Sequence, residues 1–412
     1  MSMDIRVDGN RLWQSLMEMG QVGALPNGGC CRAALSKEDQ AGRDLFVRWC
    51  CEAGCDVTYD QVGNIYARRP GLDPARPACA TGSHLDTQPH GGKFDGIYGV
   101  LAGLEVVRSL NDAGVRTAAP IDVIVWTNEE GVRFDPPLAG SSAFAGVVDV
   151  PDVHSARTVD GTTVLADLEA IGYLGHEPPG RRRLDCFVEA HIEQGPILEA
   201  EGRVIGVVTQ IQGIRWSRVS VSGMDSHAGT TPMDRRRDAL VGAAQMIVAL
   251  NLLAREHDAA TRLTVGKIEV EPNSGATIPG RATFIVDLRH PDSGTLDMLE
   301  SRIRELVAGI ARDLRLEAAI ARIIDKPPVL FAGDLVDQVR DAARRCGYPS
   351  MDMLSGAGHD AMNVARVAPT AMIFVPCRDG LSHNEAESAT PAHLAAGATT
   401  LLHVLLARAG RA

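Results

Sequence analysis

Four short segments of the chain carry histidine, acidic residues or both, and each lies next to an apolar run. They are GSHLDTQPHGGKFDG at 82–96, NEEG at 128–131, EAHIEQGPILE at 189–199 and LSHNEAE at 381–387. Histidine and carboxylate side chains suit a first-row divalent ion such as Zn²⁺. Together the segments yield three histidines, an aspartate and a glutamate. Two ions bridged by one carboxylate would use all five.

The NEEG segment places two carboxylates, Glu129 and Glu130, directly after the β-branched run Ile121–Trp126. Adjacent residues at a strand end point in different directions. One carboxylate could therefore bind a metal while the other reaches a water molecule, whose pKa metal coordination lowers towards about 7. A solvated strand end is the alternative, and an isolated pair of glutamates would favour it.

The other motifs also have two interpretations. Asp86 stands two residues after His84 and could hydrogen-bond its imidazole, but a polar loop with a chance histidine fits the segment as well. A lone histidine such as His191 is more often structural. Arg289 ends an apolar run with no local partner, which suits bidentate capture of a carboxylate, and a structural salt bridge fits equally well. His359 lies in a glycine-rich turn, where it could cover a site.

The elements that must position these residues follow from the hydrophobic pattern. The run IDVIVW at 121–126 predicts a strand buried on both faces. The spacing of apolar residues predicts helices at 36–54 and 97–110, and Ser36 is the expected N-cap of the first helix. Strands alternating with helices indicate an α/β domain. Open α/β sheets bind ligands in loops at the carboxyl ends of their strands, where the motifs stand.

The pattern changes near Gln212. Strands are predicted at 216–222, 263–271, 281–290 and 316–324, and helices at 234–256 and 294–312. The order βαββαβ is that of the ferredoxin-like split βαβ unit. An inserted domain is therefore predicted at 213–328, inside a catalytic domain at 1–212 and 329–412. The first of the two helices carries Leu240, Ala244 and Ile247 on one face.

Composition narrows the class of protein. A chain of 412 residues with 45% hydrophobic residues predicts two globular domains. The net charge of −11 and the 4% aromatic content argue against a nucleic-acid partner. The nine cysteines form no CxxC pair and indicate free thiols in a reducing compartment; Cys30 and Cys31 have no assigned role. No apolar run reaches the roughly 18 residues of a membrane span, and the N-terminus has no signal-peptide pattern, so a cytoplasmic protein is expected.

Taken together, the motifs resemble the amidase and carbamoylase branch of the dinuclear metallo-aminoacylase/carboxypeptidase superfamily. That branch includes N-carbamoyl-L-amino-acid hydrolases, yeast-type β-alanine synthase (β-ureidopropionase) and allantoate amidohydrolases. The resemblance runs from RDLFVRWCCEAG through HAGTTPMDRRRDA to SHNEAE, nearly the whole chain. It implies an α/β fold: a mixed-sheet, aminopeptidase-like catalytic domain with an inserted ferredoxin-like α+β domain that acts as lid and dimerisation domain.

The resemblance also implies metal ligands. His84 and His191 would bind one divalent ion, Glu130 and His383 a second, and Asp95 would bridge them. Zinc is the expected metal, with manganese, cobalt and nickel as alternatives.

The roles around the metals follow from the same resemblance. Asp86 would orient His84, and Glu129 would act as general base and acid. His227 would stabilise the oxyanion from the partner subunit of a homodimer. The substrate contacts would be Gln194, Asn273, Arg289 and His359. The family pattern also predicts a cis peptide bond between Asp95 and Gly96.

The expected reaction is hydrolysis of an N-carbamoyl-L-amino acid to the amino acid, ammonia and carbon dioxide. β-Ureidopropionase and allantoate amidohydrolase are alternatives, because the sequence does not encode the distance between ureido group and carboxylate. A dipeptidase is a further one. A non-catalytic ligand-binding protein on the same fold is the alternative from a different class.

Overall fold

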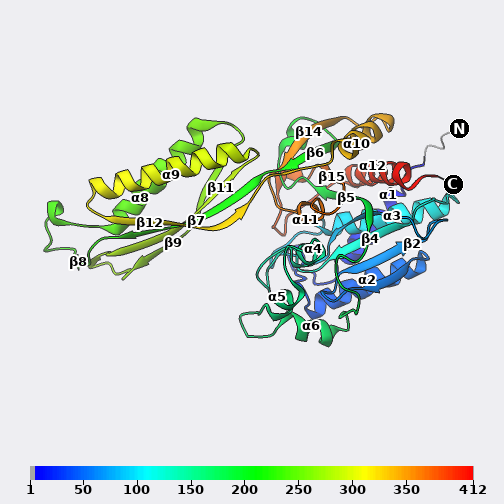
Figure 1. The fold of residues 1–412 in the computed structure, drawn as a ribbon, viewed down its shortest axis with the longest axis horizontal. Helices are drawn as coiled ribbons and strands as arrows, with labels where there is room; N and C mark the ends of the chain where they lie inside the picture. Colours follow the sequence, from blue (N-terminus) through cyan, green and yellow to red (C-terminus); the bar gives the residue numbers. More distant parts are fainter. Residues whose placement is uncertain (1–4, 412) are drawn as a thin grey trace. The chain divides into compact units, whose positions relative to one another are not determined.

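The structure, a computed structural model, describes residues 5–411 and divides into two compact units (Figure 1). One unit comprises Met1–Thr209 and Leu330–Ala412, and the other comprises Gln210–Val329. The predicted catalytic domain includes residues 1–4 and 412, which lie outside the described residues. The two units are called unit 1 and unit 2 below.

Unit 1 is built on a mixed β-sheet. Its strands are β1 (Asp56–Tyr59), β2 (Ile65–Arg69), β3 (Ala78–His84), β4 (Ile121–Trp126), β5 (Leu184–Ile192), β6 (Ile205–Ile211), β13 (Val329–Leu330), β14 (Ser350–Ser355) and β15 (Thr370–Val375). The order is β1-β2-β4-β3-β5-β15-β6-β13, and β14 also pairs with β6. The central strands β4, β3, β5 and β15 are parallel, whereas β1 pairs antiparallel with β2, β2 with β4, and β6 with β15. The prediction of a mixed-sheet α/β domain is confirmed.

The helices of unit 1 are α1 (Gly9–Met19), α2 (Lys37–Glu52), α3 (Ile97–Asp112), α4 (Ala139–Phe144), α5 (Val150–Ser155), α6 (Val164–Ile171), α7 (Ile197–Ala200), α10 (Gly333–Arg345), α11 (Ala361–Val364) and α12 (Pro391–Ala409), with a short 3-10 turn, η2 (Arg378–Gly380). The α2 helix begins after Ser36, whose hydroxyl accepts a hydrogen bond from the Asp39 N–H, as its sequence predicts. The α3 helix packs on β3 and against α12, and its apolar residues are buried almost all round.

Unit 2 contains a four-stranded antiparallel sheet in the order β12-β7-β11-β9. Its elements are β7 (Gly213–Ser222), β8 (Ser226–His227), η1 (Met233–Arg235), α8 (Ala239–His257), β9 (Arg262–Glu271), β10 (Thr277–Ile278), β11 (Arg281–His290), α9 (Ser293–Asp313) and β12 (Glu317–Lys326). Figure 1 shows α8 and α9 side by side on one face of this sheet. The main elements follow the order βαββαβ, as predicted for a ferredoxin-like insert.

The apolar residues that the sequence places on one face of α8 differ in burial, because Ile247 packs against the core of unit 2 whereas Ala244 is exposed. Residues such as Ala243, Met246 and Leu250 pack into the core of unit 2, whereas Leu240 is exposed. The helix is apolar almost all round, so its periodicity does not select a face. Among residues 5–411, α8 alone is long and apolar enough to cross a membrane by length and composition, a test that the core helix of a soluble protein also passes.

The predicted cis peptide bond between Asp95 and Gly96 is wrong. Within residues 5–411 the cis bonds are Asp135–Pro136 and Glu271–Pro272. The chain instead turns at Gly96, which has a φ of +69°, a conformation that glycine adopts without steric cost.

Candidate active site

The predicted metal ligands all lie at one edge of the sheet in unit 1. His84 is the last residue of β3, and His191 is the next-to-last residue of β5. Glu130 stands in the turn after β4, His383 in the loop after β15, and Asp95 just before α3. Because β3, β4, β5 and β15 run parallel, their carboxyl ends meet at this edge.

Asp95 lies between two groups of ligands and turns one oxygen towards each. Its Oδ1 lies 3.1 Å from His191 Nε2 and 3.9 Å from His84 Nε2. Its Oδ2 lies 3.2 Å from His383 Nε2, and that nitrogen is 3.5 Å from Glu130 Oε2. Within each group of three, the ligand atoms lie within 4.8 Å of one another. The five residues therefore form two groups that share one carboxylate.

The donors fit a divalent cation in each group. Metal–ligand bonds to nitrogen and oxygen are about 2.0–2.2 Å long, so atoms this close can share one ion after small side-chain movements. Asp95 is 4% exposed and the Glu130 side chain 6% exposed. Buried carboxylates are normally paired or coordinate metals. The side chain of His383 is half exposed, so the group that contains it faces solvent.

Backbone carbonyls set the tautomers of two histidines. His84 Nδ1–H donates to the carbonyl of Asp86 at 2.9 Å, and His191 Nδ1–H donates to the carbonyl of Ile192 at 2.8 Å. In each neutral ring Nε2 therefore carries a lone pair, the form that binds metals. The Gly96 N–H donates to His191 Nε2 at 3.1 Å, so a cation at His191 must displace this hydrogen bond.

The pKa values of these groups reflect burial and mutual contact. Burial lowers the pKa of His84 to about 4. Burial also opposes a charge on His191, but the hydrogen bond and charge of Asp95 outweigh it and raise the pKa of His191 to about 9. The hydrogen bond to Asp95 likewise raises the pKa of His383 to about 9. Protons therefore compete with cations for His191 and His383.

Glu129 lies beside the ligands, with its Oε2 3.5 Å from His84 Nε2. Burial and then the charge of Glu130 raise the pKa of Glu129 well above its usual value. A higher pKa makes its carboxylate a stronger proton acceptor. Asn128, which begins this turn, has a φ of +55°, a strained conformation that is concentrated at functional sites.

The Asp86 carboxylate does a different job from the predicted one. It lies 3.9 Å from His84 Nδ1, whose hydrogen bond goes to the backbone carbonyl of Asp86 instead. The carboxylate accepts hydrogen bonds from the backbone N–H groups of Glu129 at 3.3 Å and Glu130 at 3.1 Å. Burial raises the pKa of Asp86 to about 7. Asp86 therefore orients His84 through its backbone and holds the NEEG turn through its side chain.

Gln194 and His359, two predicted substrate contacts, also lie at this edge. Gln194 has a φ of +56°, and its Nε2 donates to Asp95 Oδ2 at 2.9 Å. His359 is buried, its Nε2 lies 3.0 Å from Ser355 Oγ, and its ring centroid is 4.5 Å from that of His191. His359 therefore packs directly against a predicted metal ligand.

Glu387 is a site residue that the sequence reading missed. Its Oε1 accepts hydrogen bonds from the backbone N–H groups of Phe94 at 2.9 Å and Asp95 at 3.2 Å, and its Oε2 accepts from Ser382 Oγ at 2.9 Å. Ser382 Oγ also lies 3.0 Å from Asp95 Oδ2, so its single proton is shared between the two carboxylates. Glu387 is the last residue of the SHNEAE motif, which also contains the predicted ligand His383. Its place in this motif was the feature of the sequence that could have identified it.

Two glycines allow this close packing. A Cβ atom on Gly92 would lie 2.0 Å from the Glu387 carboxylate, and one on Gly96 would lie 2.3 Å from the His84 ring. The glycines of GGKFDG are therefore needed where the loop passes between the ligands.

In unit 2, His227 and Asn273 are exposed. His227 Nδ1 accepts hydrogen bonds from the N–H groups of Gly229 at 3.0 Å and Thr230 at 3.2 Å, so its neutral ring carries the proton on Nε2. Asn273 has a φ of +53°.

The prediction that Arg289 has no local partner is wrong. Its Nε donates to Asp287 Oδ1 at 3.0 Å, and its Nη2 donates to Asp287 Oδ2 at 2.9 Å. The two residues are two positions apart on β11, so their side chains lie on the same face of the strand. The structural salt bridge that the sequence left open is therefore present.

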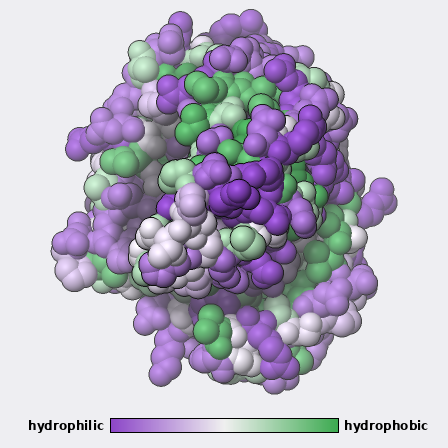
Figure 2. Space-filling view, turned by 90° about the vertical axis from the view of Figure 1, so that its left-hand side faces the viewer, coloured by the Kyte–Doolittle hydropathy of each residue, from purple (hydrophilic) through white to green (hydrophobic). Residues whose placement is uncertain are grey.

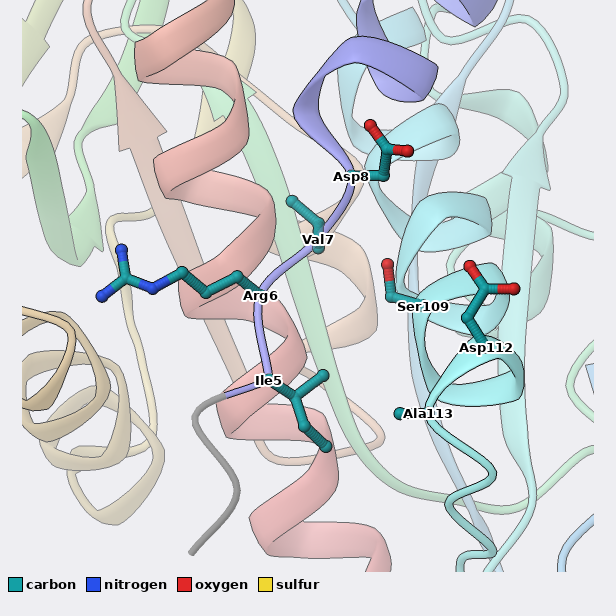
Figure 3. A pocket seen from close by; sticks show the side chains of 7 residues that line it. All are labelled: Ile5, Arg6, Val7, Asp8, Ser109, Asp112 and Ala113. Carbon is teal, nitrogen blue, oxygen red and sulfur yellow. The ribbon is translucent and has the colours of Figure 1, made fainter.

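A surface pocket elsewhere in unit 1 contains none of these residues (Figure 3). It has a volume of about 530 Å³ and is lined by the N-terminal segment and the end of α3. Its acidic groups are Asp8 and Asp112, and the guanidinium of Arg6 points away from Asp112. The pocket contributes nothing to the candidate site.

The fold and the site define a class of protein. Histidine and carboxylate donors stand at the carboxyl ends of parallel strands, beside a buried glutamate whose pKa is raised, which is the arrangement of a metal-dependent hydrolase.

Comparison with known proteins identifies the family. The model of Peptidase family M20/M25/M40 matches residues 80–407, and the chain belongs to this metal-dependent family. An N-carbamoyl-L-amino-acid amidohydrolase of Rhizobium meliloti is 45% identical over 401 residues, which cover 97% of this chain and 96% of that protein. An allantoate amidohydrolase of Bacillus subtilis is 33% identical over 94% of each chain. The crystal structure of a hydantoinase/carbamoylase family amidase from Burkholderia multivorans matches with a TM-score of 0.94 and 54% identity over 98% of each chain.

Proposed function

We propose that this protein is a metal-dependent amidohydrolase that cleaves N-carbamoyl-L-amino acids to the amino acid, ammonia and carbon dioxide. The observation that carries the proposal is the pair of ligand groups that share Asp95, with Glu129 beside them. The similarity to the Rhizobium meliloti amidohydrolase over nearly the whole chain supports the choice of substrate.

The first group, His84, His191 and Asp95, would hold one divalent cation, and the second, Asp95, Glu130 and His383, would hold another. Such cations supply a Lewis acid for the carbamoyl carbonyl and activate a water molecule. Zinc suits this donor set, and manganese, cobalt and nickel are alternatives.

Glu129 would accept the proton of the attacking water and donate it to the leaving nitrogen. Its buried position and raised pKa favour proton uptake, and the hydrogen bonds from its turn to Asp86 keep it in place. A proton taken up at the first step is then available at the second, so one residue serves both.

Two side chains of unit 2, those of His227 and Arg289, have roles in the proposed reaction. His227 would donate its Nε2 proton to the tetrahedral oxyanion, which suits the tautomer set by Gly229 and Thr230. Arg289 would hold the substrate carboxylate, and its pairing with Asp287 fixes the plane of the guanidinium. We also assign the substrate contacts Gln194, Asn273 and His359.

We propose that the enzyme is a homodimer formed through unit 2, whose partner copy supplies His227. The outer face of α8 exposes Val241, Val248 and Leu252, spaced seven and four residues apart and therefore on one side of the helix. Figure 2 shows hydrophobic areas in green among a mainly purple surface. An apolar stripe of this kind indicates a protein interface.

We also propose a cytoplasmic location, with a small ureido compound as substrate and neither nucleic acid nor membrane as partner. The nine free cysteines fit a reducing compartment.

The decisive experiment measures ammonia release from N-carbamoyl-L-amino acids, ureidopropionate and allantoate, before and after metal removal and reloading. We expect the highest kcat/KM with an N-carbamoyl-L-amino acid. A preference for allantoate would favour the second candidate, which the Bacillus subtilis relative supports. If no ureido compound is hydrolysed and Glu129→Gln alters no property, the chain is a non-catalytic binding protein.

The dimer has its own test. Mixing and exchanging subunits of Glu129→Gln and His227→Ala variants should restore part of the activity if His227 acts in the partner's site. Exchanged mixtures that stay inactive would refute the role in trans.

A further inference from the structure

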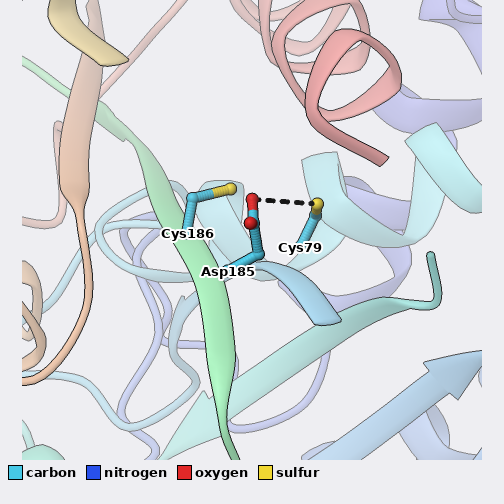
Figure 4. Close-up of side chains that lie close together, drawn as sticks. All are labelled: Cys79, Asp185 and Cys186. Atoms are coloured by element: carbon cyan, nitrogen blue, oxygen red, sulfur yellow. Dashed lines mark hydrogen bonds between the residues drawn. The ribbon is translucent and has the colours of Figure 1, made fainter. Parts of the chain in front are cut away.

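A second group of potential metal ligands lies at the opposite ends of the strands that carry the candidate site. Cys79 on β3 and Cys186 on β5 are paired in register on neighbouring parallel strands, and both are fully buried. Asp185 lies beside them (Figure 4). One ligand atom from each of the three residues lies within 4.8 Å of the others. Within residues 5–411, no other cysteine belongs to such a group.

A β-bulge brings the carboxylate to the two thiols. The register runs from Ala78 opposite Leu184 to Cys79 opposite Cys186, so Asp185 is the extra residue of β5. In a regular strand the side chains of adjacent residues point to opposite faces, whereas a bulge redirects one of them. The Asp185 carboxylate thereby comes within 3.8 Å of Cys79 Sγ, as the dashed line in Figure 4 marks.

The charges around the group suit a divalent cation. Arg408 of α12 donates from its Nε to Asp185 Oδ2 at 3.0 Å. Two thiolates and the Asp185 carboxylate carry a charge of −3, and the Arg408 guanidinium, which also pairs with Asp334 at 3.2 Å, offsets only part of it, so the group favours a divalent cation. The Asp185 side chain is 37% exposed, so the group has a route to solvent.

The distances are also suitable. Zinc–sulfur bonds are about 2.3 Å and zinc–oxygen bonds about 2.0–2.2 Å, so a tetrahedral sulfur ligand and a tetrahedral oxygen ligand lie roughly 3.5–3.7 Å apart. The Cys79 Sγ–Asp185 Oδ2 distance of 3.8 Å is slightly longer, so a small side-chain movement brings the two atoms to this separation. Contact with Cys186 and burial raise the pKa of Cys79 well above its usual value, so its thiol is protonated until a cation displaces the proton.

We propose that Cys79, Cys186 and Asp185 form a binding site for one thiophilic divalent cation, separate from the candidate active site. Binding replaces two S–H bonds by two metal–thiolate bonds and releases two protons to solvent. The site lies five residues before His84 on β3 and five residues before His191 on β5. At about 3.3 Å per residue it is roughly 16 Å from those ligands, and a bound ion would tie the two strands together.

The test is a titration of the reduced protein, with its active-site metals already loaded, with Cd²⁺. Thiolate ligands give cadmium an ultraviolet charge-transfer band that imidazole and carboxylate ligands do not give. We expect the band to saturate at one equivalent per chain and to be lost in Cys79→Ser and Cys186→Ser. Because Asp185 is partly exposed, Asp185→Asn should fold normally and weaken the binding by at least about 10-fold.

The matched control is Cys51→Ser, which removes an exposed thiol outside the group and should leave the band unchanged. Circular dichroism melting checks that each variant is folded. If the serine variants fail to fold, the cadmium affinity of Asp185→Asn is the test of the proposal. A wild-type protein without the band, or an unchanged band in Asp185→Asn or in folded serine variants, would overturn the proposal. Peroxide cross-linking of Cys79 to Cys186 in a protein that gives no cadmium band would show an oxidisable thiol pair instead.

Discussion

The candidate site residues of the two units differ in how far the fold has already arranged them. In unit 1 the two ligand groups are in mutual contact, and most of their members are buried at the ends of adjacent parallel strands. In unit 2, His227 is exposed on the two-residue strand β8, Asn273 is exposed in the loop after β9, and Arg289 is paired with a neighbour on its own strand. Metal ligands need positions accurate to a fraction of an ångström, which rigid strand ends provide. The groups of unit 2 are proposed as substrate contacts, and such contacts can be completed when a substrate binds.

The largest expected effect comes from breaking the shared carboxylate of unit 1. Asp95→Ala removes a ligand from both groups, so we expect loss of both cations and activity below detection. Elemental analysis and ammonia release measure the two effects. Asp160→Ala, which removes an exposed carboxylate in the same unit, should retain both properties. An Asp95→Ala protein that keeps full metal content would contradict the bridging role.

The adjacent glutamates should fail in two different ways. Glu129→Gln removes the proton acceptor but no ligand, so we expect kcat to fall by about 10²–10⁴-fold with metal content unchanged. Glu130→Gln removes a ligand of the second group, so we expect lower metal content as well. The roles would have to be exchanged if Glu129→Gln lost metal and Glu130→Gln did not.

A smaller effect is expected from the oxyanion donor in unit 2. His227→Ala should lower kcat by about 10²–10³-fold, the usual loss for one oxyanion donor, while metal content stays unchanged. His257→Ala, also in unit 2, is the control and should behave as the unaltered protein. Loss of metal in His227→Ala would contradict the assignment of metal binding to unit 1 alone.

Arg289→Ala should act mainly on KM. A hydrogen bond to a charged group contributes about 1.5–3 kcal/mol, which corresponds to roughly a 10–150-fold increase in KM. Steady-state kinetics over a range of substrate concentrations gives the value. Asp287→Asn leaves the guanidinium in place and should change KM less. An unchanged KM in Arg289→Ala would limit Arg289 to its structural salt bridge.

The smallest effect is expected from Glu387, which contacts the ligand Asp95 but is not itself a proposed metal ligand. Glu387→Gln weakens the acceptor that holds the backbone of Asp95, and we expect metal affinity to fall by about 10–100-fold, the range found for groups that support ligands. Competition with a metal-binding dye measures this affinity. Glu385→Gln alters a neighbouring carboxylate that pairs with His90, and its affinity should be unchanged. Equal metal affinities in Glu387→Gln and Glu385→Gln would show that Glu387 does not support the metal ligands.

Much of the fold was predictable because its signals are local. The strand predicted for the apolar run at 121–126 begins and ends at the same residues as β4, and Ser36 is the N-cap of α2, as predicted. The buried face of α8 was not predictable, because that helix is apolar almost all round. The cis bond at Asp95 was also wrong, since the positive φ of Gly96 makes the turn in a trans chain.

The site shows the same division. Residue types and their places after apolar runs indicated candidate metal ligands, and the resemblance to the family assigned them to two groups. The contacts of Asp86 and Glu387 escaped prediction, and the salt bridge of Arg289 was left open, because each contact depends on which backbone or side-chain group lies opposite in space. Asp86 binds the NEEG turn, Glu387 binds a loop nearly three hundred residues earlier, and Arg289 binds Asp287.

The sequence alone supplied the candidate metal ligands and the strands they follow, because these depend on residue type and local periodicity, and its ordered motifs supplied the resemblance to the family. Only the tertiary structure decided which oxygen of Asp95 faces which group, and that Cys79, Asp185 and Cys186 meet. Such contacts depend on strand register and on a single bulged residue. A strand's own periodicity fixes which way its side chains face, but the partner strand decides what they meet.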